Sequence, residues 1–340
     1  MTATNGQSLF RRTRYPLVIL SLSFILAVVW SAGYLLTAAP SSPDKAVTVT
    51  IPKGASLKGI VSILADASLV SDKYAFFVLA RFSRYARHLP AGEFALHGGQ
   101  RPLALLNELA TAKPVTYTVT LPEGLTAADM AGIFAEGGWC DQKEYLRLVA
   151  DPAFIAKLDF AGLPNLEGYL YPDTYHLTKD DGAAGVIVMQ VRRFKEVWKA
   201  LGGDRLDETT RRRIIILASL VEKETALAPE RPLIAGVFAN RLRLGMPLQS
   251  DPTVLYGVTS QTRPITRADL ERPTPYNTYV IAGLPAGPIA NPGRESLSAA
   301  LAPAKTDFLY FVAKNDGSHQ FSTTLTEHNA AVQQYQRQGK

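Results

Sequence analysis

The sequence predicts an α+β protein in which one membrane-spanning helix precedes a small mixed α/β domain and a larger one. Three observations support this fold class. An uncharged apolar run lies near the N-terminus, a strand–turn–helix pattern occurs twice, and long helical patterns later give way to a C-terminal hairpin signal. The 340 residues are enough for one membrane anchor and about two folded domains.

The apolar run LVILSLSFILAVVWSAGYLLTAA is long enough to cross a bilayer, which takes about 20 residues in a helix. Three arginines precede it, whereas Asp44 and Lys45 follow it. Positive charge is retained on the cytoplasmic side, so we expect a single-pass inner-membrane protein whose later part is periplasmic. The expected segments are a cytoplasmic N-terminus at 1–16, a transmembrane helix at 17–39 and a linker at 40–45.

A cleaved signal peptide is the alternative reading of this run. Signal peptides have an apolar region of about 7–15 residues that ends in a small-x-small cleavage site. The apolar run is longer than that, and Ala38-Ala39-Pro40 is a poor cleavage context. These features favour a retained anchor.

A repeat follows the linker. The segment TVTIPKG at 48–54 recurs as TVTLPEG at 118–124. Each copy leads into a helical pattern of apolar residues: Leu57, Ile60, Val61 and Leu64 in the first copy, and Ala128, Met130, Ile133 and Phe134 in the second. The sequence therefore predicts two units of strand, Pro-x-Gly turn and amphipathic helix.

The remaining patterns place the other elements. Between the two copies we expect a helix at 74–85, a turn and then a strand within 90–96, and a helix at 101–111, with Leu103, Leu106 and Leu109 as its core stripe. A boundary near 112–114 separates a membrane-proximal domain at 46–113 from a domain at 114–335. In the latter we expect helices at 183–201, 207–226 and 229–244, a hairpin formed by 308–312 and 319–322, and a helix from Thr326.

The helix around residues 214–225 carries the most informative residue. Leu217, Leu220, Val221 and Glu224 fall on one stripe at i, i+3, i+4 and i+7. A carboxyl group that ends an apolar stripe is expected to lose hydration and to have a raised pKa, as a general acid near neutral pH requires. Glu222 lies about 200° around the same helix, so the two cannot act together on one face.

Glu224 is therefore the candidate catalytic residue, and a structural reading stays open beside it. In that reading, Glu224 points to solvent at the helix end and pairs with Lys223 or Arg231.

Polar and aromatic residues gather in the loops that follow this helix. Tyrosine rings offer flat amphipathic surfaces to sugars, and amide side chains pair with hydroxyl and N-acetyl groups. On this basis the candidate substrate-binding residues are Gln249, Asp251, Tyr256, Asn277 and Tyr279. Asp251 is also the one nearby candidate for a second carboxylate in catalysis.

Composition argues against several other classes of protein. The net charge of +6 is mild and spread along the chain, which does not indicate nucleic-acid binding. The five histidines are scattered, so we predict no metal and no cofactor. Cys140 follows Gly-Gly-Trp and has no histidine nearby, which favours a half-buried structural cysteine over a catalytic thiol.

Four long segments carry a resemblance to a known family. They are EGYLYPDTY at 167–175, LASLVEKETALAPERPLIAGVFANRLRLGMPLQSDPTVLYG at 217–257, ITRADLERPTPYNTY at 265–279 and GLPAGPIANPG at 283–293. In these segments the chain closely resembles the endolytic murein transglycosylase family, whose members are also called YceG-like. Together with the anchor, the resemblance covers nearly all of the exported chain.

The resemblance implies a peptidoglycan lytic transglycosylase that cuts the β-1,4 bond between N-acetylmuramic acid and N-acetylglucosamine. It would cut within nascent glycan strands, leave 1,6-anhydromuramyl ends and thereby end strand elongation, with peptidoglycan synthases as possible partners. The catalytic residue would be the second glutamate of the EKE motif, Glu224. It also implies a LysM-like, glycan-binding role for 46–113, which the first strand–turn–helix copy resembles weakly; a structural spacer is the alternative.

Two rival functions stay open on the sequence. One is a peptidoglycan hydrolase that produces reducing ends, which a second carboxylate at Asp251 would make possible. The other is a non-catalytic wall-binding or synthase-scaffolding protein.

Overall fold

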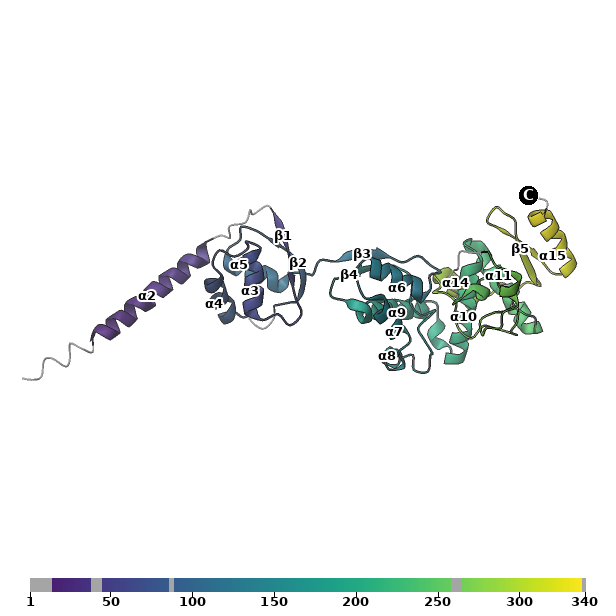
Figure 1. Ribbon diagram of the computed structural model, residues 1–340, viewed down its shortest axis with the longest axis horizontal. Coiled ribbons are helices and arrows are strands. Elements are labelled where there is room, and N and C mark those ends of the chain that lie inside the picture. The colour runs from purple at the N-terminus through teal and green to yellow at the C-terminus, as the bar shows by residue number, and fades with distance from the viewer. Residues whose placement is uncertain (1–13, 38–44, 86–88, 258–263, 338–340) are drawn as a thin grey trace, which may run out of the picture. The chain divides into compact units, whose positions relative to one another are not determined.

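The computed structural model describes residues 14–37, 45–85, 89–257 and 264–337. It divides into two compact units (Figure 1). The first unit ends at Thr116 and also takes in Thr178–Asp180, and the second comprises Tyr117–Leu177 and the chain from Asp181 onward. Helices combine with three separate two-stranded sheets, so the chain has the expected mixed α/β composition.

The helix α2 (Arg14–Leu36) contains the predicted membrane span. Among the described residues it is the one helix long and apolar enough to cross a membrane, from Val18 to Leu36. A signal sequence would meet the same criteria, so the helix alone does not separate the two readings. The helix ends before the predicted end of the span at residue 39. The predicted cytoplasmic residues 1–13 and most of the predicted linker lie outside the described residues.

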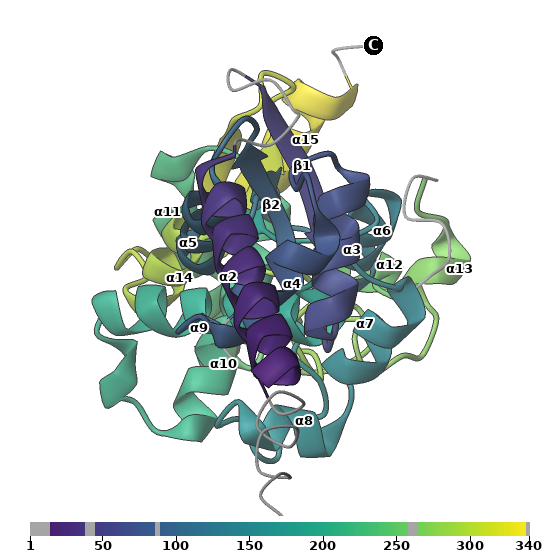
Figure 2. The same ribbon diagram turned by 90° about the vertical axis from the view of Figure 1, so that its left-hand side faces the viewer.

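The first unit pairs two strands and covers them with helices. Strand β1 (Ala46–Ile51) runs antiparallel to β2 (Gly92–His97), with Ala46 opposite His97 and Ile51 opposite Gly92. Helix α3 (Leu57–Asp66) packs beside β1 and α5 (Pro102–Thr111) beside β2, and α4 (Lys73–Phe82) contacts both helices (Figure 2). A core that includes Leu64, Phe76, Phe94 and Leu106 fills the space between them.

The stripe predicted for α5 was partly wrong. Leu106 and Leu109 are buried, but Leu103 is 52% exposed and Leu105 is buried in its place. A spacing of three residues drifts about 60° around an α-helix at each step, so a stripe made only of i+3 steps leaves the core face. The true stripe alternates steps of three and one around Leu105 and Leu106.

The second unit is built mainly from helices. Two of its strands, β3 (Tyr117–Thr120) and β4 (Thr174–Leu177), form an antiparallel pair, and β5 (Tyr310–Ala313) and β6 (His319–Ser322) form the predicted hairpin. The helices and 3₁₀ turns before the candidate site are α6 (Ala127–Glu136), α7 (Gln142–Val149), α8 (Pro152–Lys157), α9 (Gly182–Ala200) and η1 (Gly203–Arg205). Those that follow are α10 (Glu208–Glu224), η2 (Ala228–Glu230), α11 (Arg231–Leu244), α12 (Pro252–Leu255), α13 (Arg267–Leu270), α14 (Arg294–Leu301), α15 (Leu325–Val332) and the π-helical turn η3 (Gln333–Arg337).

Both copies of the sequence repeat adopt the predicted local structure. In each copy a strand leads through the Pro-x-Gly turn into a helix, β1 into α3 and β3 into α6. The turn glycines, Gly54 and Gly124, have φ of 77° and 78°, a left-handed conformation that favours glycine. A hydroxyl side chain then caps each helix, Ser56 on α3 and Thr126 on α6. Within the second helix the prediction for Ala128 was wrong, because Ala128 is exposed and Ala127 is buried instead.

Candidate active site

The catalytic candidate Glu224 is the last residue of α10. Leu217, Leu220 and Val221 are buried on the stripe that it completes, as predicted. The Ser250 hydroxyl donates a hydrogen bond to Oε1 of Glu224. The alternative pairing of Glu224 with Lys223 or Arg231 is therefore wrong.

The environment of Glu224 has the expected effect on its proton affinity. Burial raises the pKa of Glu224 to about 7. The hydrogen bond from Ser250 opposes this rise, the negative charge of Asp251 adds to it, and the positive charge of Arg241 opposes it. A carboxyl group with this pKa is substantially protonated near neutral pH, so it can give up a proton and take one back.

Glu222 has a different role on the same helix. Its side chain is 5% exposed, its Oε1 lies 3.3 Å from the Arg231 guanidinium, and its Oε2 accepts a hydrogen bond of 2.9 Å from the Gly293 amide. Arg231 also contacts Glu123 at 3.4 Å. These contacts tie the end of α10 to the starts of α11 and α14, so Glu222 has a structural role.

Ser250, which was not among the predicted site residues, is fixed against Glu224 by a small hydroxyl network. Ser250 is 2% exposed, its amide donates to Thr278 Oγ1 at 3.0 Å, and its carbonyl accepts from Thr253 Oγ1 at 2.6 Å. The hydroxyls of Thr253 and Thr278 lie 2.9 Å apart. A serine between two predicted site residues, Gln249 and Asp251, was the available signal.

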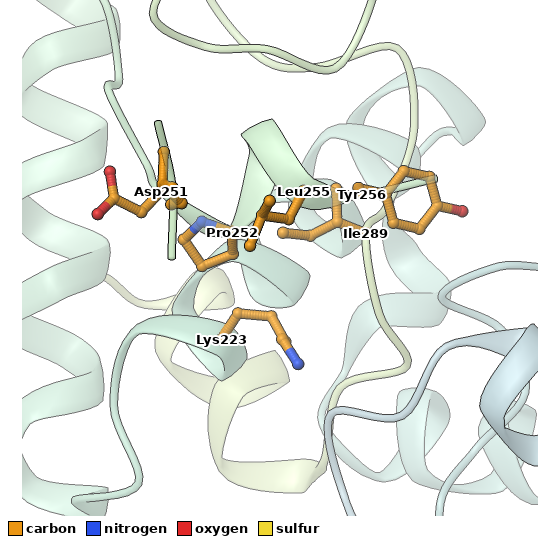
Figure 3. A pocket seen from close by; sticks show the side chains of 7 residues that line it. Lys223, Asp251, Pro252, Leu255, Tyr256 and Ile289 are labelled. Atoms are coloured by element: carbon orange, nitrogen blue, oxygen red, sulfur yellow. The ribbon is translucent and has the colours of Figure 1, made fainter. Parts of the chain in front are cut away.

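Asp251 and Tyr256 line a hollow of about 230 Å³ beside the end of α10, here called the first hollow. Its other lining residues are Lys223, Pro252, Leu255, Ile265 and Ile289 (Figure 3). Tyr256 contributes its ring, while its hydroxyl points away from the other lining side chains. Oδ1 of Asp251 accepts a hydrogen bond of 2.6 Å from the Tyr279 hydroxyl.

The other predicted binding residues occupy different places. Gln249 is exposed and has a left-handed φ of 51°. Its backbone amide donates a hydrogen bond of 3.2 Å to the Thr278 carbonyl, and its side chain does not line the first hollow. Tyr279 is half-buried and reaches the site through Asp251. Burial and the hydrogen bond to Asp251 raise the pKa of Tyr279, so its hydroxyl stays protonated and remains a donor.

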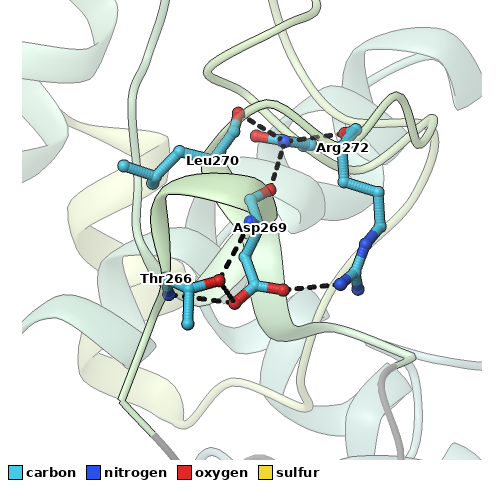
Figure 4. Close-up of polar contacts among 5 residues, drawn as sticks. Thr266, Asp269, Leu270 and Arg272 are labelled. Atoms are coloured by element: carbon cyan, nitrogen blue, oxygen red, sulfur yellow. Dashed lines mark hydrogen bonds and ion pairs between the residues drawn. The ribbon is translucent and has the colours of Figure 1, made fainter.

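The prediction that Asn277 lines the cleft is wrong. Asn277 is 1% exposed, and its Nδ2 donates to the carbonyls of Asp269, Leu270 and Arg272 at 3.2, 3.0 and 2.8 Å. Its Oδ1 accepts from the Tyr279 amide at 3.0 Å. The amide that suits a sugar suits backbone carbonyls equally, and here it ties the next turn to α13. Thr266 and Asp269 cap the start of α13, and Arg272 binds Asp269 (Figure 4).

Another buried carboxyl group, Glu167, supports the Tyr256 side of the first hollow. It is 5% exposed and accepts hydrogen bonds from the Ala127 amide at 3.0 and 3.1 Å, from Asn291 Nδ2 at 2.6 Å and from the Tyr256 hydroxyl at 3.1 Å. Burial raises the pKa of Glu167 to about 7, and these hydrogen bonds oppose the rise. In the sequence, the signal was a charged residue inside the apolar and aromatic run LEGYLY, since a buried charge requires partners.

Asn291 extends this network to a third loop. Its Oδ1 accepts from the amides of Gly168 and Leu170 at 2.8 and 3.0 Å, and its Nδ2 also donates to the Leu125 carbonyl at 3.0 Å. Three of the four segments that suggested the family therefore meet at Glu167, through Glu167 itself, Tyr256 and Asn291. We infer that the network sets the position of the Tyr256 ring.

Metal-ligating and thiol groups do not gather in the described part of the chain. No three His, Cys, Asp or Glu side chains there lie close enough together to hold a metal ion. Cys140 is half-buried, and burial raises the pKa of its thiol, which disfavours a reactive thiolate.

Comparisons with known proteins identify relatives of this chain. Residues 49–334 match the sequence profile of the YceG-like family. An endolytic murein transglycosylase of Bacillus subtilis (strain 168) is 34% identical over 307 residues, which cover 85% of this chain and 84% of the relative. One of Streptococcus pneumoniae serotype 2 is 30% identical over 359 residues, covering 93% of this chain and 65% of the relative.

A solved structure is similar as well. The crystal structure of a YceG-like protein from Listeria monocytogenes aligns with a TM-score of 0.56 and 31% sequence identity. The alignment covers 84% of this chain and 98% of that one.

Proposed function

Since the chain belongs to the YceG-like family, it is a peptidoglycan lytic transglycosylase, and we propose that Glu224 is its single acid–base group. The observation that carries the proposal is a half-buried carboxyl group with a pKa of about 7, which accepts a hydrogen bond from Ser250 and follows Lys223, a residue that lines the first hollow. Its relatives from two organisms are named endolytic murein transglycosylases. The activity makes the chain a lyase that acts on peptidoglycan.

The proposed target is the β-1,4 bond between N-acetylmuramic acid and N-acetylglucosamine. Glu224 donates its proton to the glycosidic oxygen while the bond to the muramyl anomeric carbon breaks and an oxocarbenium-like centre develops. The resulting carboxylate takes the proton of the muramyl 6-hydroxyl, and that oxygen bonds to the anomeric carbon. The products are a free N-acetylglucosamine hydroxyl and a 1,6-anhydromuramyl end, and no water is consumed.

The masses of the products test this reaction. Purified glycan strands incubated with the full chain in detergent should give fragments that end in anhydromuramyl groups. Fragments heavier by one water would identify a hydrolase and direct attention to Asp251. Strand binding without any cleavage would support the non-catalytic alternative.

We expect opposite pH shifts from two substitutions that flank Glu224. Activity should fall as pH rises through the pKa of about 7, because the first step needs the protonated acid. Ser250→Ala removes a contact that lowers this pKa, so the alkaline limb of the kcat profile should move up. Asp251→Asn removes a charge that raises it, so the limb should move down, each by roughly 0.5–1 pH unit.

These shifts are measured as kcat against pH for the two variants and the wild type. The two directions serve as controls for each other, because a general loss of stability would move both profiles the same way. Shifts of equal sign would contradict the assignment of this limb to Glu224.

We further propose that four residues contact the bound glycan strand: Asp251, Tyr256, Gln249 and Tyr279. Asp251 and Tyr256 line the first hollow, and Gln249 and Tyr279 adjoin it through the loop of Ser250. Alanine substitutions that leave KM unchanged would remove each residue from this role.

The proposed location is the inner membrane, with residues 1–16 in the cytoplasm and the chain after the linker in the periplasm. The apolar span of α2 and the arginines before that span support this orientation. Sequencing the N-terminus of the mature protein tests it, because a cleaved signal peptide would leave a new N-terminus near residue 40. Protease added to the outer side of spheroplasts should digest the part of the chain that follows the linker.

For residues 46–113 we propose a LysM-like glycan-binding role. The order strand, helix, helix, strand in β1, α3, α4 and β2 supports it. Equal co-sedimentation of glycan strands with the Glu224→Gln chain, with or without these residues, would remove this role. A part in ending strand elongation beside peptidoglycan synthases follows from the family, and longer strands in cells that lack the protein would support it.

A further inference from the structure

A second hollow, of about 560 Å³, lies against the N-terminal half of α10. From α10 it is lined by Glu208, Thr209, Arg212, Arg213 and Ile216, and otherwise by Gly162, Leu163 and the loop 282–286. Two guanidinium groups therefore face one open space.

The lining of the second hollow continues to the first. A smaller recess shares Arg212 with the second hollow and is also lined by Glu167 and Tyr276. The Tyr276 ring packs on the ring of Tyr256 with centroids 4.6 Å apart, and Tyr256 lines the first hollow. A continuous series of lining residues thus leads from the catalytic end of α10 back to Arg213.

The helix sets the distance between the two hollows. Arg213 and Glu224 are eleven positions apart in the sequence, which corresponds to a rise of about 16 Å. The stripe between them is buried, so a polymer that presents one bond to Glu224 reaches the second hollow over the lining loops beside the helix and meets Arg213 several sugars away.

Arg212 and Arg213 are free to bind the carboxylate of a ligand. Arg213 is exposed, and Arg212 is half-buried and donates one hydrogen bond of 2.8 Å to the Ala286 carbonyl. Within the described ranges, neither forms an ion pair with a carboxylate. The planar guanidinium group favours bidentate contacts with carboxylates. Glu208 in the same lining disfavours a purely anionic ligand and suits one that also carries an amine.

We propose that the second hollow binds a carboxylate of a stem peptide carried by a muramyl residue remote from the bond that is cut. This proposal rests on the proposed function, because it takes the glycan strand as the substrate. Stem peptides carry carboxylates and amines on an otherwise uniform strand, so this contact favours peptide-bearing over bare strands.

The test compares peptide-bearing strands with strands from which an amidase has removed the peptides. For the peptide-bearing strands, Arg213→Ala should raise KM about 5-fold and leave kcat near the wild-type value, since the site is exposed. Arg213→Glu should raise KM further through repulsion. Neither substitution should change KM for the bare strands. Arg205→Ala, which removes an exposed arginine outside the hollow, is the matched control and should change neither value.

Each other outcome overturns the inference or the function separately. Equal effects of Arg213→Ala on both substrates would mean general attraction or a structural role, and unchanged KM on both would mean no contact. Either result overturns the peptide site while the cleavage reaction stands. If the wild type cleaves neither substrate, the proposed function itself fails.

Discussion

Replacing Glu224 with glutamine should reduce kcat for strand cleavage by at least about 10³-fold. The amide can neither give a proton to the glycosidic oxygen nor take one from the muramyl 6-hydroxyl, and one group performs both steps. The first hollow and its neighbouring loops should remain in place, so KM should change little. Product formation followed by mass spectrometry measures the loss.

The same variant should be more stable than the wild type above about pH 7. Burial raises the pKa of Glu224 in the folded chain, so its ionised form is disfavoured there, and the wild type loses stability as pH rises from about 4.3 through about 7. Glutamine stays neutral and avoids this loss. A variant that is inactive yet more stable at pH 8 would have lost its chemistry and kept its fold.

Glu222→Gln is the matched control on the same helix. It should weaken the contact with Arg231 and lower the stability, while kcat falls by less than about 10-fold. If cleavage instead survives in Glu224→Gln and disappears in Glu222→Gln, the catalytic role belongs to Glu222.

Glu167→Ala should destabilise the second unit by about 3–5 kcal/mol. The substitution leaves the Ala127 amide, Asn291 Nδ2 and the Tyr256 hydroxyl without their acceptor in a buried place, and it opens a cavity. Denaturant unfolding of the detergent-solubilised chain measures the change. The fluorescence of Trp198, which is 4% exposed in the core of this unit, reports on it.

This loss should itself depend on pH. Since burial raises the pKa of Glu167 to about 7, the stabilisation by the protonated group is complete below its unfolded pKa of about 4.3 and is lost as pH rises through about 7. The difference between wild type and variant should therefore be largest near pH 4 and smaller at pH 8. A difference that grows with pH would show that Glu167 is folded as a stabilised anion.

Tyr256→Phe provides the control for the network. It removes one donor to Glu167 and keeps the ring that lines the first hollow, so it should cost about 1 kcal/mol. If Glu167→Ala costs no more than this, the remaining hydrogen bonds of the network do not support the site.

Local features of the chain could be predicted because they depend on neighbours in sequence. The stripe of Leu217, Leu220 and Val221 placed Glu224 on a buried face, since helical periodicity acts over a few turns. The end of α11 at Gly245, with φ of 71°, and the left-handed turn at Gly54 follow from the conformational freedom of glycine.

The errors arose where a residue type suits two environments. Asn277 has the amide expected of a residue that binds sugar, but its Nδ2 donates its hydrogen bonds to three backbone carbonyls instead. Leu103 has the size and apolarity of a core residue, but its position at the edge of the stripe exposes it. Composition and spacing do not separate these cases, because burial depends on what packs above each residue.

The sequence by itself determined the family, the mixed α/β class, the apolar helix and the glutamate that ends the apolar stripe of α10. Only the tertiary structure decided that Ser250 contacts Glu224, that Glu167 joins Asn291 and Tyr256, and that Glu222 pairs with Arg231. The first two contacts join residues 26 and 89–124 positions apart. Local periodicity carries no information over such separations, because these contacts form only when the loops after α10 fold back against it.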